Sequence, residues 1–378
     1  MNEPAPQPAA AARGVWCVVR ELGLAALAVG LLATSGTTLA QAPATNPIPA
    51  AAVARIVAEP YMKVTNGATG AVELQVAARK LVPANGKGPV IWLTGASHIG
   101  ETNYYAQLQK HLDAQALVLF EGVNAGRKLA ATNAPATPSA PAPAPAAKTP
   151  ERTSLQKDLA ESLGLVFQLE AVNYTRPHFR NSDLSVAQLQ ELMEKEESPD
   201  PAAPESAKEK RKNEAFDTLL KAMEGDSLFG SLLKAGFKLV GGNPRFQAMT
   251  KLALIEALGS IRGDLSRMKS LPEDVQRLME VLIQSRNDAV LKDLRAELKR
   301  AQPVASISIF YGAGHMDDLE RRIRREFGYR PDGDLWLPAF SVDYTKAGLN
   351  VIEATFIRAM IQRQIQEMLP SEKPDGEK

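Results

Sequence analysis

The run "VASISIFYGAGHMDD" (Val304–Asp318) joins a strand-like segment to a helix-like one through small residues and a histidine. Its first half is nearly continuously apolar, which is typical of a strand covered on both faces of a parallel or mixed sheet. Three small residues (312–314) follow, then His315. Apolar residues at helical spacing from Met316 to Phe327 predict a helix directly afterwards. The run therefore predicts a sharp turn at the carboxyl end of a buried strand, with an imidazole in the turn.

The same design occurs earlier, in "VIWLTGASHIGE" (Val90–Glu101), where an apolar strand ends at Gly95 and His98 follows two small residues. Each of these G-x-x-H tetrads is followed by a first-turn acid, Glu101 or Asp318, of the kind that a helix dipole favours. Ligands of open α/β sheets bind at the carboxyl ends of the strands, so we expect both histidines at one site. Because glycine lets the backbone approach a bound group, we also expect cofactor-binding glycines at Gly95, Gly312 and Gly314.

The rest of the chain alternates between apolar β-rich runs and helical patterns, which predicts an α/β fold. We expect a mixed, mostly parallel central sheet flanked by helices. The expected strands are Ala71–Val82, Pro89–Gly95, Ala116–Gly122, Val304–Gly312 and Gly333–Tyr344, and the expected helices include Thr102–Asp113 and Leu349–Met368.

The two tetrads are separated by a large insertion. An Ala/Pro-rich linker (131–150) and a charged, proline-broken linker (194–212) precede a helical insertion (213–300). We therefore expect a single α/β domain over 61–348, followed by a C-terminal helix and charged tail (349–378).

The N-terminus resembles a targeting segment. The apolar run of about 12 residues, Leu22–Ala33, is shorter than the roughly 20 that span a bilayer, and small residues around Ala40 suit cleavage. We expect a signal peptide over 1–40, a flexible mature start (41–60) and a periplasmic or secreted protein without a transmembrane span. An uncleaved segment would instead anchor the chain to a membrane. Cys17, the one cysteine in the sequence, would leave with the peptide, so thiolate chemistry is excluded from the mature chain.

Two charged residues fall where apolar ones are expected. Glu121 ends "ALVLFEG", at the end of a buried strand, where a carboxylate is costly unless it is paired or metal-bound. His98, His315 and Glu121 thus form a two-histidine, one-carboxylate set of the type that holds a divalent metal. Arg286 lies on the apolar stripe of a helix predicted over Ser270–Arg300 and needs an anionic partner, as a structural ion pair or as part of a site.

These residues are the basis of a resemblance. The segments "LTGASHIGETNYYAQLQKHLDAQALVLFEGV", "QSRND" and "ISIFYGAGHMDDLERRIRREFGY" resemble the TraB/PrgY/GumN family, which is related to the Tiki proteins and, more widely, to erythromycin esterase-like and ChaN-like proteins. The resemblance implies a metal-dependent protease-like site made by His98, His315, Glu121 and Arg286. Tyr174 and Asp183, in "YTRPHFRNSD", align only weakly with the family pattern.

The expected function is therefore a metal-dependent hydrolase that acts on peptide bonds, with manganese or cobalt favoured and zinc possible. Glu121 would be a ligand or the general base, and Arg286 would stabilise an oxyanion or orient Glu121. The alternatives are a non-catalytic metal- or haem-binding protein of the ChaN-like type and an inactive interaction protein.

Other classes are disfavoured. The sequence has no G-x-S-x-G and no H-E-x-x-H motif, which disfavours serine hydrolases and thermolysin-like proteases. The net charge of +1 gives no indication of nucleic-acid binding, so the expected partner is a peptide or small-molecule substrate.

Overall fold

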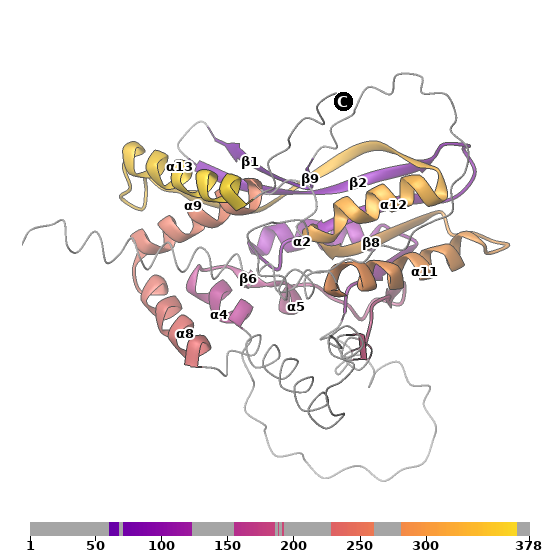
Figure 1. Cartoon of the computed structure of the whole chain (residues 1–378), viewed down its shortest axis with the longest axis horizontal. Coiled ribbons are helices and arrows are strands. Elements are labelled where there is room, and N and C mark those ends of the chain that lie inside the picture. The colour runs from indigo at the N-terminus through magenta and orange to yellow at the C-terminus, as the bar shows by residue number, and fades with distance from the viewer. Residues whose placement is uncertain are drawn as a thin grey trace, which may run out of the picture.

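The computed structural model of the chain describes residues 60–67, 71–122, 155–185, 188, 191–192, 228–260 and 281–368. They form an α/β fold whose central seven-stranded mixed sheet is flanked by helices (Figure 1), as expected from the sequence. The signal peptide, both linkers and the parts 213–227 and 261–280 of the insertion lie outside the described residues. In the described part of the insertion, α8 (Leu228–Gly241), α9 (Pro244–Ser260) and α11 (Arg286–Leu298) are helical, as predicted.

One half of the sheet is antiparallel and is organised around the long strand β2 (Ala71–Pro83). Along one edge, β2 pairs first with β1 (Met62–Asn66), which the sequence pattern did not indicate, and then with β3 (Val90–Ala96). Along the other edge it pairs over its full length with β9 (Tyr329–Asp343). The predicted return strand near 333–344 is therefore present and begins earlier than expected.

The other half is parallel and carries the strand ends of interest. Here β8 (Ser306–Gly312) lies between β3 and β5 (Leu117–Phe120) and pairs with both, and β7 (Phe179–Asn181) pairs with the far edge of β5. The predicted βαβ unit of β3, α2 (Thr102–Asp113) and β5 exists, but its strands are not neighbours, because β8 is inserted between them.

Two apolar cores cover the two faces of the sheet. Because successive strand side chains point to opposite faces, Val118 and Phe120 of β5 belong to one core and Leu119 to the other. The first core contains α2, α4 (Leu155–Ser162), α9 and α13 (Val351–Met368), and the second contains α11 and α12 (Met316–Phe327). Figure 1 shows α9 and α13 packed side by side at the end of the sheet where β1 lies.

Short elements complete the fold around the ends of β3 and β8. The two-residue strands β4 (Ile99–Gly100) and β6 (Val166–Phe167) pair with each other, and β6 leads into the short helix α5 (Gln168–Ala171). A π-helical turn, η2 (Val281–Ser285), precedes α11, and a 3₁₀ turn, η3 (Ala313–His315), joins β8 to α12. Among the described helices, none has the length and apolar character that a membrane span requires.

Candidate active site

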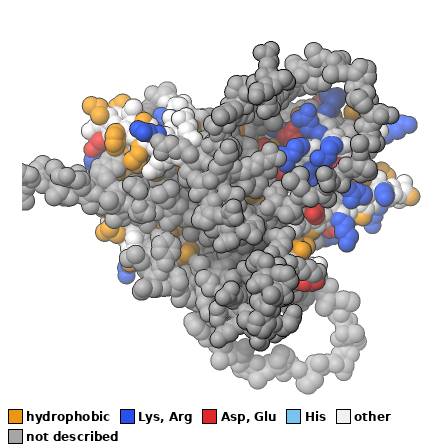
Figure 2. Space-filling view, viewed as in Figure 1, with side chains coloured by type: hydrophobic (Ala, Val, Ile, Leu, Met, Phe, Trp, Pro, Cys, Tyr) orange, Lys and Arg blue, Asp and Glu red, His pale blue; other side chains and the backbone are white. Residues whose placement is uncertain are grey.

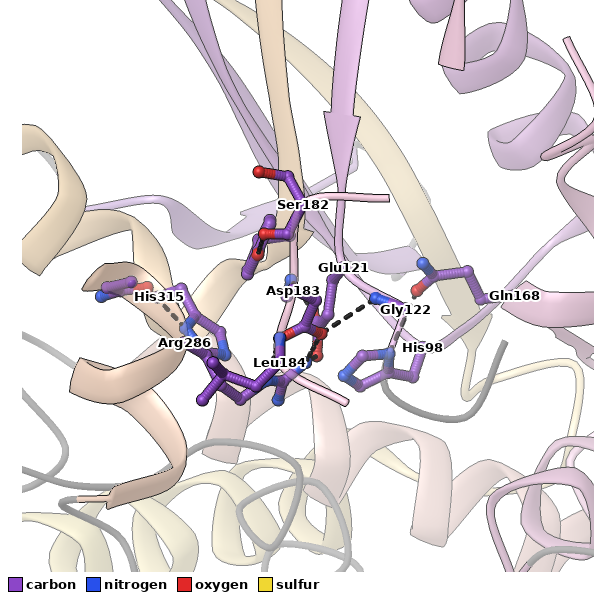
Figure 3. Close-up of polar contacts among 12 residues, drawn as sticks. His98, Glu121, Gly122, Gln168, Ser182, Asp183, Leu184, Arg286 and His315 are labelled. Carbon is purple, nitrogen blue, oxygen red and sulfur yellow. Dashed lines mark hydrogen bonds and ion pairs between the residues drawn. The ribbon is translucent and has the colours of Figure 1, made fainter. Parts of the chain in front are cut away.

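Three strand ends bring the predicted site residues together. The parallel register aligns Ala96 at the end of β3 with Gly312 at the end of β8, and Phe120 of β5 with Phe310 of β8. Glu121, directly after β5, consequently reaches β8, and its Oε2 accepts a hydrogen bond from the Gly312 N–H at 2.7 Å. Figure 3 shows His98, Glu121 and His315 around this point, with Arg286 and Asp183 beside them.

The turn after β3 holds His98 in place. Its backbone is held by α2, because the Tyr104 hydroxyl accepts the Ser97 N–H and the Tyr105 hydroxyl donates to the Ser97 carbonyl. The His98 carbonyl accepts the N–H of Gln168 at 2.9 Å, and the ring Nδ1 lies 3.1 Å from Gln168 Oε1. The other ring nitrogen, Nε2, is buried and has no hydrogen-bond partner among the described residues.

His315 is held in the same manner from the opposite side. It ends the 3₁₀ turn η3 and is fully buried. Its Nδ1 lies 2.8 Å from Oδ1 of Asn287 on α11, and its Nε2 too is buried without a partner in the described part of the chain. Burial lowers the pKa of His315 to about 4, an effect that Glu121 only partly offsets, so the ring is neutral at pH 7.

These contacts determine which nitrogen carries the ring proton. With the amide oxygens of Gln168 and Asn287 towards the rings, Nδ1 of each histidine is the donor, because an amide oxygen only accepts hydrogen bonds. The neutral ring of His315 then carries its lone pair on Nε2. A histidine whose second nitrogen donates to an oxygen is typical of metal sites. Within the described part of the chain, His178 also has a buried Nε2 without a hydrogen-bond partner, but His178 lies beside the opening residues of β5, at the other end of the sheet. What distinguishes His98 and His315 from His178 is that both lie at the strand ends and that an amide oxygen is beside Nδ1 of each ring.

Glu121 belongs to a buried ion-pair cluster. Arg286, the first residue of α11, donates from Nη2 to Glu121 Oε1 at 2.5 Å and to Asp183 Oδ2 at 2.7 Å. Asp183 also accepts the Gly122 N–H at 2.9 Å, which fixes the segment just after Glu121. Burial alone would raise the pKa of Glu121, but Arg286, the two histidines and the Gly312 N–H together lower it to about 2. Glu121 is thus ionised at neutral pH.

Gly312 lies at the centre of the arrangement. A Cβ added at residue 312 would lie 3.3 Å from His98 Nε2 and 3.5 Å from Glu121 Oε2, so the glycine leaves a small space that both polar atoms face. Two imidazole lone pairs and a carboxylate oxygen are suitable donors for manganese, cobalt or zinc. Among the described residues, no three histidine, cysteine or acidic side chains are close enough to enclose an ion as they stand. The site therefore offers two histidine donors, with Glu121 already held by Arg286 and Gly312.

The remaining predicted residues have different positions. A Cβ at Gly95 would meet the Ala77 carbonyl and the Val76 side chain at 3.1 Å, so that glycine is needed for close packing against β2. Gly314 lies inside η3. Glu101 accepts hydrogen bonds from Ser341 on β9, outside the site.

The site includes four residues that the sequence analysis did not assign firmly. Gln168 and Asn287 had no predicted role, and Tyr174 and Asp183 were only weak candidates. Gln168 and Asn287, which orient the histidines, were missed: Asn287 follows Arg286 directly in the sequence, but Gln168 has no sequence signal. Tyr174 accepts a hydrogen bond from Gln168 Nε2 at 2.9 Å, and Asp183 is a partner of Arg286, so both belong to the site.

No protein-family model matches the chain, and neither a curated protein nor a solved structure is similar to it at a significant level. The resemblance to the TraB/PrgY/GumN family therefore stays a prediction that is based on the two tetrads, Glu121 and Arg286.

Proposed function

We propose that the site is the active centre of a metal-dependent hydrolase of the TraB/Tiki type that acts on peptide bonds in the periplasm or outside the cell. The observation that supports it best is the pair of buried Nε2 atoms, on His98 and His315, that the described residues leave unpartnered beside Glu121. These two nitrogens would hold a divalent ion such as manganese, cobalt or zinc. A bound ion would activate water and polarise the scissile carbonyl.

The chain's own groups have distinct roles in this proposal. Glu121, with a pKa of about 2, is a weak base, and its two oxygens already accept hydrogen bonds from Arg286 and Gly312. Arg286 therefore orients Glu121 rather than facing a substrate. Burial raises the pKa of Tyr174, so its hydroxyl keeps its proton. Since that hydroxyl accepts from Gln168, its proton is directed elsewhere and can be donated to a substrate oxygen.

Binding without turnover is the second candidate, and a specific observation supports it. Because Glu121 is so weak a base in this cluster, the two histidines would hold a metal without turnover. An iron–porphyrin, as in the ChaN-like branch, is the other ligand of this candidate function.

A nucleic-acid partner is not part of the proposal. In the view of Figure 2, Lys and Arg side chains are gathered on one side of the molecule. This is the side where α11 and α12 lie in Figure 1. Arginines of these helices are held in ion pairs with carboxylates, which offsets part of their charge: Arg295 and Arg325 with Glu326, Arg322 with Asp288, and Arg324 with Glu320. A peptide or small molecule at the strand ends is the partner that we propose.

The test measures metal binding first and hydrolysis second. The chain from Gln41 onward, freed of metal with a chelator, is titrated with Mn²⁺, Co²⁺ and Zn²⁺ by calorimetry, alongside His98→Ala and His315→Ala. His178→Ala is the matched control, because its Nε2 is also buried but lies at the other end of the sheet. We expect one ion per chain in the wild type and the control and loss of binding in both site variants; no binding to the wild type would end the proposal. Peptide-library hydrolysis by the loaded wild type then separates an enzyme from a binding protein.

A further inference from the structure

A chain of three buried polar side chains leads from α12 through α11 to His315. Asn287 Nδ2 donates to Asp318 Oδ2 at 2.9 Å, and Asn287 Oδ1 lies 2.8 Å from His315 Nδ1. Asn287 and His315 are fully buried, and Asp318 is only 6% exposed. Water has little access to these three side chains, so each of them depends on the next for its hydrogen bond.

The carboxylate determines which way the amide points. An ionised carboxylate only accepts hydrogen bonds, so the NH₂ group of Asn287 must face Asp318 and its oxygen must face His315. Arg321 and Arg322, one turn further along α12, form ion pairs with Asp318 and hold its carboxylate in place. The oxygen in turn requires a proton on Nδ1 of His315, which leaves the lone pair on Nε2.

The equivalent arrangement at His98 is less strict. Gln168 donates to the Tyr174 hydroxyl, but a hydroxyl can both donate and accept, so it would tolerate either orientation of the Gln168 amide. His315 is therefore the histidine whose tautomer is imposed by a charged group.

From this geometry we infer that Asn287 is a positioning residue, which transmits the acceptor character of Asp318 to His315 and keeps the Nε2 lone pair of His315 directed into the site. The inference about the tautomer depends only on the described hydrogen bonds. Its consequence for metal binding rests on the proposed function. Groups that orient a metal-binding histidine typically change metal affinity 10–100-fold when they are removed.

The test reads the tautomer directly in the metal-free protein. Protonated and unprotonated ring nitrogens give well-separated ¹⁵N signals, and the sequence contains only four histidines, so a spectrum of ¹⁵N-histidine-labelled protein can be assigned by single histidine substitutions. The variants are Asn287→Leu, which removes donor and acceptor, and Asn287→Asp, which keeps an oxygen facing Nδ1. Tyr61→Phe is the matched control, because it removes a buried hydrogen bond to another carboxylate on α12, that of Glu320, away from the site.

We expect His315 to be protonated on Nδ1 in the wild type, in Asn287→Asp and in Tyr61→Phe, and to populate the Nε2–H form in Asn287→Leu. Affinity for Mn²⁺, Co²⁺ or Zn²⁺ should fall about 10–100-fold in Asn287→Leu alone. An unchanged Nδ1–H tautomer in Asn287→Leu would overturn the inference. If that variant does not fold, Asp318→Asn replaces it: its amide can donate as well as accept, so Asn287 can turn over and the Nε2–H form should appear, and its absence would likewise overturn the inference. A wild type with the expected tautomer but without metal affinity would contradict the proposed function and leave the role of Asn287 intact.

Discussion

His98 Nε2 and Glu121 Oε2 lie 3.3 and 3.5 Å from one point, which is the position that a Cβ at residue 312 would occupy. The backbone of Gly312 has φ −51°, which any residue can adopt. Glycine at this position therefore keeps a space free beside the two polar atoms, and the backbone does not demand it.

Gly312→Ala should consequently preserve the fold and impair the site. We expect a change in the free energy of unfolding of about 1 kcal/mol or less, because the added methyl group causes no backbone strain. Affinity for a divalent ion should fall at least about tenfold, since the methyl group lies against the histidine that would ligate it. Calorimetric titration measures the loss, and Gly242→Ala, whose Cβ would make only ordinary contacts, is the control. Undiminished affinity in Gly312→Ala would show that the ligand lies elsewhere.

Arg286→Met should destabilise the protein strongly. Side-chain exposure is 5% for Arg286, 13% for Glu121 and 0% for Asp183, so the substitution removes the arginine that two buried carboxylates share. The expected loss is about 3–5 kcal/mol at pH 7, measured by urea denaturation. Arg286→Lys, which keeps a positive charge, should lose less.

The loss of stability in Arg286→Met, relative to the wild type, should also depend on pH. In the wild type, the pKa of Glu121 is lowered from 4.5 to about 2, so its contribution to stability is complete above pH 4.5 and is lost as the pH falls towards 2. Without Arg286 the pKa rises, and protonation removes the buried charge. The difference between the two proteins should therefore narrow below pH 4.5, and a constant difference down to pH 2 would contradict the assignment.

His111 should make the fold sensitive to mild acid. Burial lowers its pKa from 6.5 to about 4, while its Nε2 lies 3.1 Å from the Thr94 hydroxyl. The unfolded chain therefore binds more protons than the folded chain between pH 6.5 and 4, so stability falls as the pH falls through this range. One such group contributes at most about 1.4 kcal/mol per pH unit. The free energy of unfolding, measured by urea denaturation at several pH values, should change less per pH unit in His111→Gln than in the wild type. Some dependence on pH should remain because of His315. An unchanged dependence of stability on pH in His111→Gln would count against this account.

Arg79→Met should affect stability without affecting the site. Arg79 is 3% exposed on β2 and pairs with the buried Glu320 on α12 and the partly exposed Asp334 on β9, so it joins three elements. We expect a loss of about 3–5 kcal/mol in urea denaturation and, below the unfolding transition, wild-type affinity for the divalent ion. Weakened ion binding by folded Arg79→Met would show that the two clusters are coupled.

The parts of the fold that repeat a simple pattern were predictable from the sequence. Apolar runs gave the main strands, helical spacing gave α2, α12 and α13, and the doubled tetrad indicated the end of the sheet where His98 and His315 lie. The pairing order was not predictable, because an apolar run such as β8 does not specify its neighbours, and β8 separates β3 from β5.

The amides that orient the histidines could not be predicted for a different reason. A glutamine or asparagine is common on helices and in loops, and its function here depends on a partner that is distant in sequence. Gln168 is 70 residues from His98, and Asn287 is 28 residues from His315. Arg286 and Glu121 were predictable because an isolated charge on an apolar stripe is costly and must be compensated.

The position of β8 also has a consequence for how the chain folds. β3 and β5 are synthesised early, but the strand that joins them begins at Ser306, so the parallel half of the sheet closes only through contacts between distant parts of the chain. Topologies dominated by such contacts fold slowly. Until β8 is inserted, His315 and Gly312 are absent from the strand ends, and no fragment that stops before them can assemble the site.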